Sequence, residues 1–157
     1  MNEPLTSQWL GRVSYEAGMR LQSELVEQKA NDPALPDRLF LLEHDPVYTT
    51  GRSVAVSDSE FAGLPHPILQ INRGGKVTYH GPGQLVGYPV LDLRTRGQDL
   101  HRHLRVLEEG LVELSRRVGV KAEIREGLTG VWCGARKLAS IWGSTYTGIQ
   151  AVCVRGS

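Results

Sequence analysis

The chain has 157 residues, of which 40% are hydrophobic, and its formal net charge at pH 7 is +1. This length and composition suffice for one hydrophobic core, so we expect a single domain over residues 1–157. The near-zero net charge gives no electrostatic argument for nucleic-acid binding. No apolar run is long enough to span a membrane. Met1 is followed by an acid and a proline rather than a basic, apolar leader, so the sequence predicts a cytoplasmic protein.

The first predicted helix covers residues 14–29. Apolar residues recur at four-residue spacing from Val13 to Leu25, and Ser14 is placed to cap the helix. A loop with two prolines follows at residues 31–36. Strands are expected next at residues 38–43, 67–71 and 85–93. Pro89 in the last of these suggests a sheet edge or a bulge.

The most regular predicted helix lies in the second half of the chain. Apolar residues from Leu100 to Val118 alternate spacings of three and four, and Gly119 would end the helix. We expect this apolar stripe to face the core. Further strands are expected at residues 121–125, 130–133 and 137–141. Two helices among several strands, without strict alternation, indicate an α+β fold with a mixed β-sheet and flanking helices.

Three histidines stand outside any dense motif. His101 and His103 lie two positions apart on the predicted helix and do not face each other, so we expect no shared metal ion. His66 lies between prolines and is expected at the surface.

The segment from Arg73 to Leu85 reads RGGKVTYHGPGQL and places four glycines among hydrogen-bonding side chains. Glycine lets a ligand approach the backbone closely, and Pro82 fixes the direction of the chain, so the segment predicts a binding cradle with exposed N–H groups. The alternative is a pair of tight turns flanking a strand. The segment has neither the phosphate-loop pattern nor the dinucleotide-binding fingerprint.

This segment resembles the signature R-G-G-x-x-T-Y-H-G-P-G-Q-L of the octanoyltransferases of lipoate biosynthesis. Residues 43–52 are similar to the family's E-H-x-P-V-Y-T-x-G-R segment, and residues 130–141 to its G-V-W and R-K-[IL]-A-S-I segment. The resemblance extends over about residues 10–141. It implies the fold of the biotin and lipoate protein ligase catalytic domains.

The resemblance also implies an activity. The family moves an octanoyl or lipoyl group from acyl carrier protein to one lysine of a lipoyl domain through a cysteine thioester. The implied partners are octanoyl-acyl carrier protein, the lipoyl domains of 2-oxoacid dehydrogenases and the glycine cleavage H protein, with no cofactor and no metal ion. By motif match Lys137 is the catalytic lysine, because an ammonium favours a neighbouring thiolate. The match further implies that the acyl and lysine-arm pocket is lined by Arg73, Gly74, Gly75, Lys76, Val77, Thr78, Tyr79, His80, Ser140 and Ile141.

The family's P-C-G motif, which carries the nucleophile, does not occur in the chain. We therefore expect a domain that is incomplete after about residue 141, by frameshift or truncation, and that is inactive or impaired. Its open sheet edge would favour aggregation. Cys133 lies four residues before Lys137, where a hairpin could bring the two together, although a buried structural role is the favoured interpretation. Cys153 has flanking residues that match nothing in the family.

Two other functions stay open. The chain could hold octanoyl or lipoyl groups without transferring them, or it could be related to the ATP-dependent lipoate-protein ligases, which share the fold but usually show a different glycine-rich pattern. A local basic rim could steer an acidic acyl carrier protein in any of these cases; its residues would be Arg73, Lys76, Arg136 and Lys137.

Overall fold

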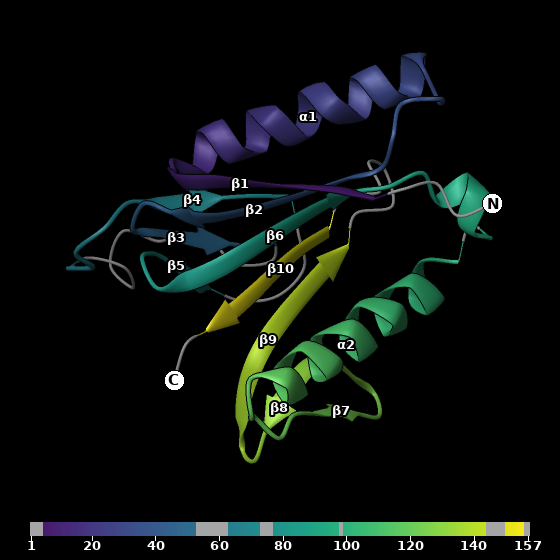
Figure 1. The fold of residues 1–157 in the computed structure, drawn as a ribbon. Helices are drawn as coiled ribbons and strands as arrows, with labels where there is room; N and C mark the ends of the chain where they lie inside the picture. The colour runs from purple at the N-terminus through teal and green to yellow at the C-terminus, as the bar shows by residue number, and fades with distance from the viewer. Residues whose placement is uncertain (1–4, 53–62, 73–76, 98, 144–149, 156–157) are drawn as a thin grey trace.

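The structure is a computed structural model that describes residues 5–52, 63–72, 77–97, 99–143 and 150–155. At residues 95–96, 142–143 and 150–155 it describes the backbone alone. Two sheets and two α-helices make up the described fold (Figure 1). The predicted α+β class with a mixed sheet is confirmed.

The larger sheet has seven strands. In spatial order they are β1 (Thr6–Val13), β2 (Arg38–His44), β6 (Gln84–Val90), β10 (Gln150–Arg155), β9 (Arg136–Gly143), β8 (Leu128–Cys133) and β7 (Glu123–Arg125). Strand β1 runs parallel to β2, and every other neighbouring pair is antiparallel. The smaller sheet has the order β4 (Ile68–Gln70), β3 (Val47–Thr50), β5 (Thr78–His80), with β3 parallel to β4 and antiparallel to β5.

Helix α1 (Tyr15–Asn31) packs over the β1, β2 and β6 half of the large sheet (Figure 1). Ser14 caps it as predicted, since its Oγ accepts a hydrogen bond from the Ala17 N–H at 3.1 Å. The hydrophobic core beneath it is formed by Phe40, Leu42, Val86 and Tyr88. In β2 the buried residues alternate with half-buried ones, as expected for a strand with one face on a core.

Helix α2 (Leu100–Arg117) packs against β7, β8 and β9, after a short 3-10 helix at Leu93–Arg96 (Figure 1). It ends as predicted at Gly119, which adopts a left-handed φ of 79°. The prediction that the whole apolar stripe faces the core is wrong at its C-terminal end, because Leu114 is 49% and Val118 70% exposed. The buried residues of α2 are instead polar: His103, Glu108 and Ser115.

Three parts of the large sheet differ from the prediction. Strand β1 was not predicted, because its residues are mostly exposed and show no alternation. Pro89 does not lie on an edge strand, because β6 is central in the sheet. The pairing of β6 with β10 covers only Gln84 to Gly87, so Pro89, which has no N–H to donate, lies outside the paired residues. The expected open edge after Ile141 is also wrong, because β10 pairs with both β9 and β6 and fills that place in the sheet.

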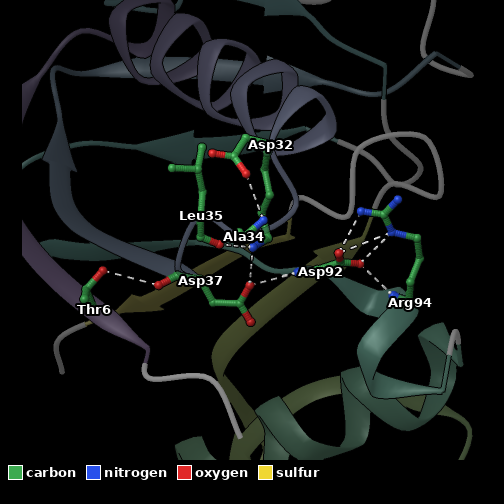
Figure 2. Close-up of polar contacts among 8 residues, drawn as sticks. Thr6, Asp32, Ala34, Leu35, Asp37, Asp92 and Arg94 are labelled. Carbon is green, nitrogen blue, oxygen red and sulfur yellow. Dashed lines mark hydrogen bonds and ion pairs between the residues drawn. The ribbon is translucent and has the colours of Figure 1, made fainter. Parts of the chain in front are cut away.

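A polar junction joins α1, β2 and the segment after β6. The Lys29 ammonium lies 3.0 Å from Asp37 Oδ1, and both side chains are buried. The Asp37 carboxylate also accepts the Asp92 N–H at 3.0 Å, and its backbone carbonyl accepts the Thr6 hydroxyl at 3.3 Å (Figure 2). Asp92 in turn pairs with Arg94 at 2.8 Å. In the part of the chain that the structure describes, no helix has the length and apolar character needed to cross a bilayer.

Candidate functional site

The three sequence motifs lie at the same end of the large sheet. Strand β6 is antiparallel to both β2 and β10, and β10 is antiparallel to β9. The C-terminal end of β2 and the N-terminal ends of β6 and β9 therefore lie on the same side. Only β10 separates β6 from β9, which places these two strands roughly 10 Å apart.

The first two motifs are joined directly. The Gly83 N–H donates a hydrogen bond to Glu43 Oε2 at 3.0 Å, and β3 pairs with β5 so that Val47 lies opposite His80. Each motif thus holds the other in place. The interpretation as tight turns flanking a strand is confirmed for the strand and the second turn, because Thr78–His80 form β5 and a turn follows it. Gly74 and Gly75 lie outside the described residues, and the binding cradle stays a prediction.

Two buried histidines form the centre of this junction. The Nδ1 of His44 donates to the Val13 carbonyl at 3.1 Å, so in the neutral ring its Nε2 accepts from the Tyr88 hydroxyl at 2.6 Å. The ring centroids of His44 and His80 are 5.9 Å apart, and the Tyr15 ring lies 5.1 Å from His44. The result is a compact cluster of aromatic rings.

His80 is fixed on both ring nitrogens. Its Nδ1 lies 2.9 Å from Gln84 Oε1 and its Nε2 3.3 Å from Thr49 Oγ1. The Gln84 amide then donates to the Tyr79 carbonyl at 3.2 Å. With 4% exposure, His80 is packed into the junction.

The pKa of His44 lies below its ordinary value of 6.5. Burial is the main cause, because it disfavours the charged ring. The Val13 carbonyl and the charges of Asp45 and Glu16 act in the opposite direction without cancelling the effect of burial. His44 is thus held neutral at neutral pH.

A second group of rings lies on the small sheet. Tyr48 and Tyr79 have ring centroids 5.2 Å apart, and His66 lies 6.3 Å from Tyr48 and 6.1 Å from Tyr79. The prediction of a plain surface position for His66 is therefore wrong, since it is half-buried against two rings. Gly81 is needed here, because the Tyr79 phenol occupies the place that a Cβ would take.

Lys137 is the second residue of β9 and lies opposite Trp132 of β8. Its ammonium is 5.3 Å from the centroid of the Trp132 ring, and a Cβ at Gly130 would lie 3.1 Å from its Nζ. Partial burial lowers the pKa of Lys137, and the charge of Glu108 raises it against that effect. A partly desolvated ammonium at this end of the sheet suits a role in stabilising an anion.

The hairpin between β8 and β9 does not bring Cys133 onto Lys137. Cys133 pairs with Arg136 and Trp132 pairs with Lys137, so the two side chains point to opposite faces of the sheet. Cys133 is a half-buried free thiol. The side chain of Cys153 lies outside the described residues.

The predicted pocket residues fall into three groups. Arg73, Gly74, Gly75 and Lys76 lie outside the described residues. Val77 is exposed, Thr78 and Tyr79 are half-buried, and His80 is buried. Ser140 and Ile141 are neighbours in β9, so their side chains point to opposite faces; Ile141 is 5% exposed and Ser140 half-buried.

Three residues of the site were not predicted. Tyr15 and Tyr88 contact His44 from α1 and β6, and Glu108 reaches Gly130 from α2. Among the described residues no three His, Cys, Asp or Glu side chains are close enough to hold a metal ion.

Comparison with known proteins agrees with this arrangement. Residues 14–150 match the family described as the lipoyl protein ligase A/B catalytic domain. The chain belongs to this family. Because the match continues to residue 150, it extends past the point at which the motif resemblance ends.

Members of the family with similar sequences are octanoyltransferases. The chain is 48% identical over 132 residues to the octanoyltransferase of Geobacter metallireducens, covering 84% of this chain and 61% of the relative. It is 50% identical over 137 residues to that of a Geobacter species, covering 84% and 63%. It is 45% identical over 138 residues to that of Synechococcus elongatus, covering 85% and 59%. The chain thus spans about three fifths of the length of these relatives.

Solved structures support the fold of the family. A bi-partite lipoate protein ligase from Thermoplasma acidophilum has a TM-score of 0.69 at 18% identity, over 98% of this chain and 60% of that one. A lipoate-protein ligase A bound with ATP has a TM-score of 0.65 at 16% identity, over 98% and 65%. The expected biotin/lipoate ligase-like architecture is confirmed.

Proposed function

We propose that the protein to which this chain belongs transfers an octanoyl or lipoyl group from acyl carrier protein to a lysine of lipoyl domains. The acceptors would be the lipoyl domains of 2-oxoacid dehydrogenases and the glycine cleavage H protein, in the cytoplasm. The observation that carries the proposal is that all three motifs, with Lys137, lie at the same end of the large sheet. Octanoyltransferases at 45–50% identity support it.

The reaction would proceed in two steps through an enzyme thioester. A cysteine thiolate attacks the carbonyl carbon of the donor thioester and releases the carrier as a thiolate, which takes up a proton. The acceptor lysine amine then attacks the enzyme thioester, forms an amide and returns the cysteine as a thiol or thiolate. Lys137 is proposed to stabilise the thiolate, because a nearby ammonium lowers the free energy of that anion.

The donors for the thioester carbonyl are proposed to come from the glycine-rich segment at residues 73–80. Backbone N–H groups aimed at a developing negative charge are effective because they are oriented before the reaction starts. Thr78 and Tyr79 are the partly accessible described members of this segment. Ser140 or Ile141 would line the pocket from β9, on the face that each presents.

Cys133 does not have the setting of a nucleophile in the described structure. It is on the face opposite Lys137, and an activated thiolate needs a cation beside it. We therefore expect little or no transfer through Cys133.

An intact-mass experiment tests the proposal. The purified chain is incubated with octanoyl-acyl carrier protein and an apo lipoyl domain, beside an active octanoyltransferase and its variants at the lysine that matches Lys137. In the active enzyme we expect the acceptor to gain one octanoyl group, and loss of that lysine to abolish the gain. The matched control replaces a lysine at the position of Lys121, which is exposed here and lies outside the motifs, and should leave the rate unchanged.

The same experiment separates the alternatives. If this chain gains an octanoyl mass and passes it on, one of its own cysteines acts, and peptide mapping chooses between Cys133 and Cys153. Acylation from free octanoate that requires ATP would instead favour a ligase. Binding of octanoate by this chain without transfer, while the active enzyme transfers in the same assay, would favour a binding module.

A further inference from the structure

A buried carboxylate of helix α2 lies behind the Lys137 hairpin. Glu108 is 1% exposed, and its Oε1 accepts the Gly130 N–H at 2.6 Å. Its Oε2 lies 2.6 Å from Arg105 Nη1. A buried carboxylate loses solvation, and these charge-assisted bonds offset the loss. A glutamine at this position would accept the same N–H without the cost of burying a charge. The negative charge of Glu108 therefore requires an explanation.

Gly130 connects this carboxylate to the lysine. Gly130 has a φ of 121°, and a Cβ added to it would collide with Lys137 Cε and lie 3.1 Å from Nζ. The end of the lysine side chain therefore rests on the Cα of the residue whose N–H Glu108 binds. Gly130 thus donates its N–H to the Glu108 carboxylate, and its Cα lies against the end of the Lys137 side chain.

We propose that Glu108 is a positioning residue for Lys137: its carboxylate fixes the Gly130 backbone on which the ammonium rests and supplies the negative charge that faces it. The inference rests on the proposed function, in which Lys137 acts on a thiolate. It assigns to α2 a role in the site that none of the three motifs contains.

The charges around Lys137 fit this role. From α2 come Glu108 and its partner Arg105; from β7 comes Arg125, whose guanidinium lies 4.8 Å from the Trp132 ring centroid and 3.0 Å from Glu123. Arg136 precedes Lys137 and is exposed. Partial burial lowers the pKa of Lys137 and Glu108 raises it, yet among the described residues Lys137 forms no ion pair. The ammonium is stabilised and still available to an incoming anion.

Titration of Lys137 in the chain tests the proposal without any need for catalysis. The variant Glu108→Gln keeps an oxygen for the Gly130 N–H and removes the charge. NMR of ¹³C-labelled lysine, assigned with Lys137→Arg, should show a lower Lys137 pKa than in the wild type. In Glu108→Gln, acylation of Lys137 by an amine-selective reagent at pH 8 should be about two- to fivefold faster than in the wild type. This factor corresponds to the free energy of one charge interaction at a partly exposed site.

Two further variants make the result specific. Glu109→Gln removes an exposed carboxylate one residue away and should leave Lys137 unchanged. Arg105→Gln removes the cation that competes for Glu108 and should raise the Lys137 pKa, opposite in sign to Glu108→Gln. A purely structural role for Glu108 would not produce shifts of opposite sign.

The proposal is overturned if Lys137 titrates unchanged in both variants or shifts in the same direction in both. If Glu108→Gln does not fold, the direction of the shift in Arg105→Gln decides alone. The proposed function fails separately: if loss of the lysine that matches Lys137 leaves transfer by the active enzyme unchanged, the titration still establishes or refutes the link between Glu108 and Lys137.

Discussion

The two ends of strand β2 both bury polar side chains, but they do so in different ways. At its start, Asp37 is paired with the Lys29 ammonium at 3.0 Å, with 3% and 9% of the side chains exposed. At its end, His44 is 0% exposed and is bonded to a hydroxyl and a carbonyl. One end combines two opposite charges, whereas the other keeps a titratable ring uncharged.

This difference matches the position of the two ends. The charged junction lies outside all three motifs and ties α1 to β2 and to the segment after β6 (Figure 2). The neutral cluster lies where the first two motifs join. A neutral cluster can hold these two motifs together without burying a charged group.

The largest expected effect breaks the charged end. In Asp37→Asn the Lys29 ammonium stays buried without a counterion, so we expect the free energy of unfolding to fall by about 3–5 kcal/mol. Urea denaturation measures it. The matched control is Asp45→Asn at the exposed Arg12 pair, where we expect a loss of about 0–1 kcal/mol. Equal losses in the two variants would show that the Lys29–Asp37 pair is not effectively buried.

A smaller effect tests the packing at the neutral end. In Gly18→Ala the new Cβ would lie 2.8 Å from His44 Cε1, so α1 must shift and the unfolding free energy should fall by about 1–3 kcal/mol. Gly110→Ala in α2 is the control, since nothing lies within 4 Å and alanine favours the helix by about 0.5–1 kcal/mol. The comparison needs thermal or urea unfolding only. Stabilisation by Gly18→Ala would mean that α1 does not approach His44 this closely.

The smallest effect is the pH response of the neutral end. Because the folded pKa of His44 is lowered, the unfolded chain binds a proton first as the pH falls through 6.5. The His44 contribution to stability is therefore complete above 6.5 and is lost between 6.5 and the lower folded pKa. Urea unfolding at pH 8, 7, 6 and 5.5 should show this fall, with a flatter slope in His44→Gln. The slope should persist in His101→Gln, which alters an exposed ring; an unchanged slope in His44→Gln would argue against a neutral His44.

Sequence reasoning found the elements whose pattern repeats locally. Helix α2 was predicted from Leu100 to Val118 and ends within a residue of that range, because leucine spacing and Gly119 both act on the nearest turns. Strand β1 was missed, since it is held by backbone pairing to β2 while Trp9 is 57% exposed. Strand β10 was missed because its pairing depends on segments far away in the chain.

The sequence predicted which motifs form the candidate site, but not which side chains contact one another there. Lys137 and His80 were found by resemblance, but the sequence gives no sign that His80 is buried against Gln84 and Thr49. Glu108 interrupts the apolar pattern of α2 and reads as a surface residue. Its buried carboxylate is bonded to Arg105 and to the backbone N–H of Gly130, which is 22 positions away and could not be predicted as a partner.

The place of β10 in the sheet has a consequence for synthesis on the ribosome. Residues 84–90 and 136–143 both leave the exit tunnel before residues 150–155, and among the described strands the two halves of the sheet pair with each other only through β10. Until β10 emerges, β6 and β9 each present an unpaired side that a neighbouring nascent chain could occupy. The two halves can form early, but they can join only after β10 has emerged. Closure of the sheet is therefore a late step in folding.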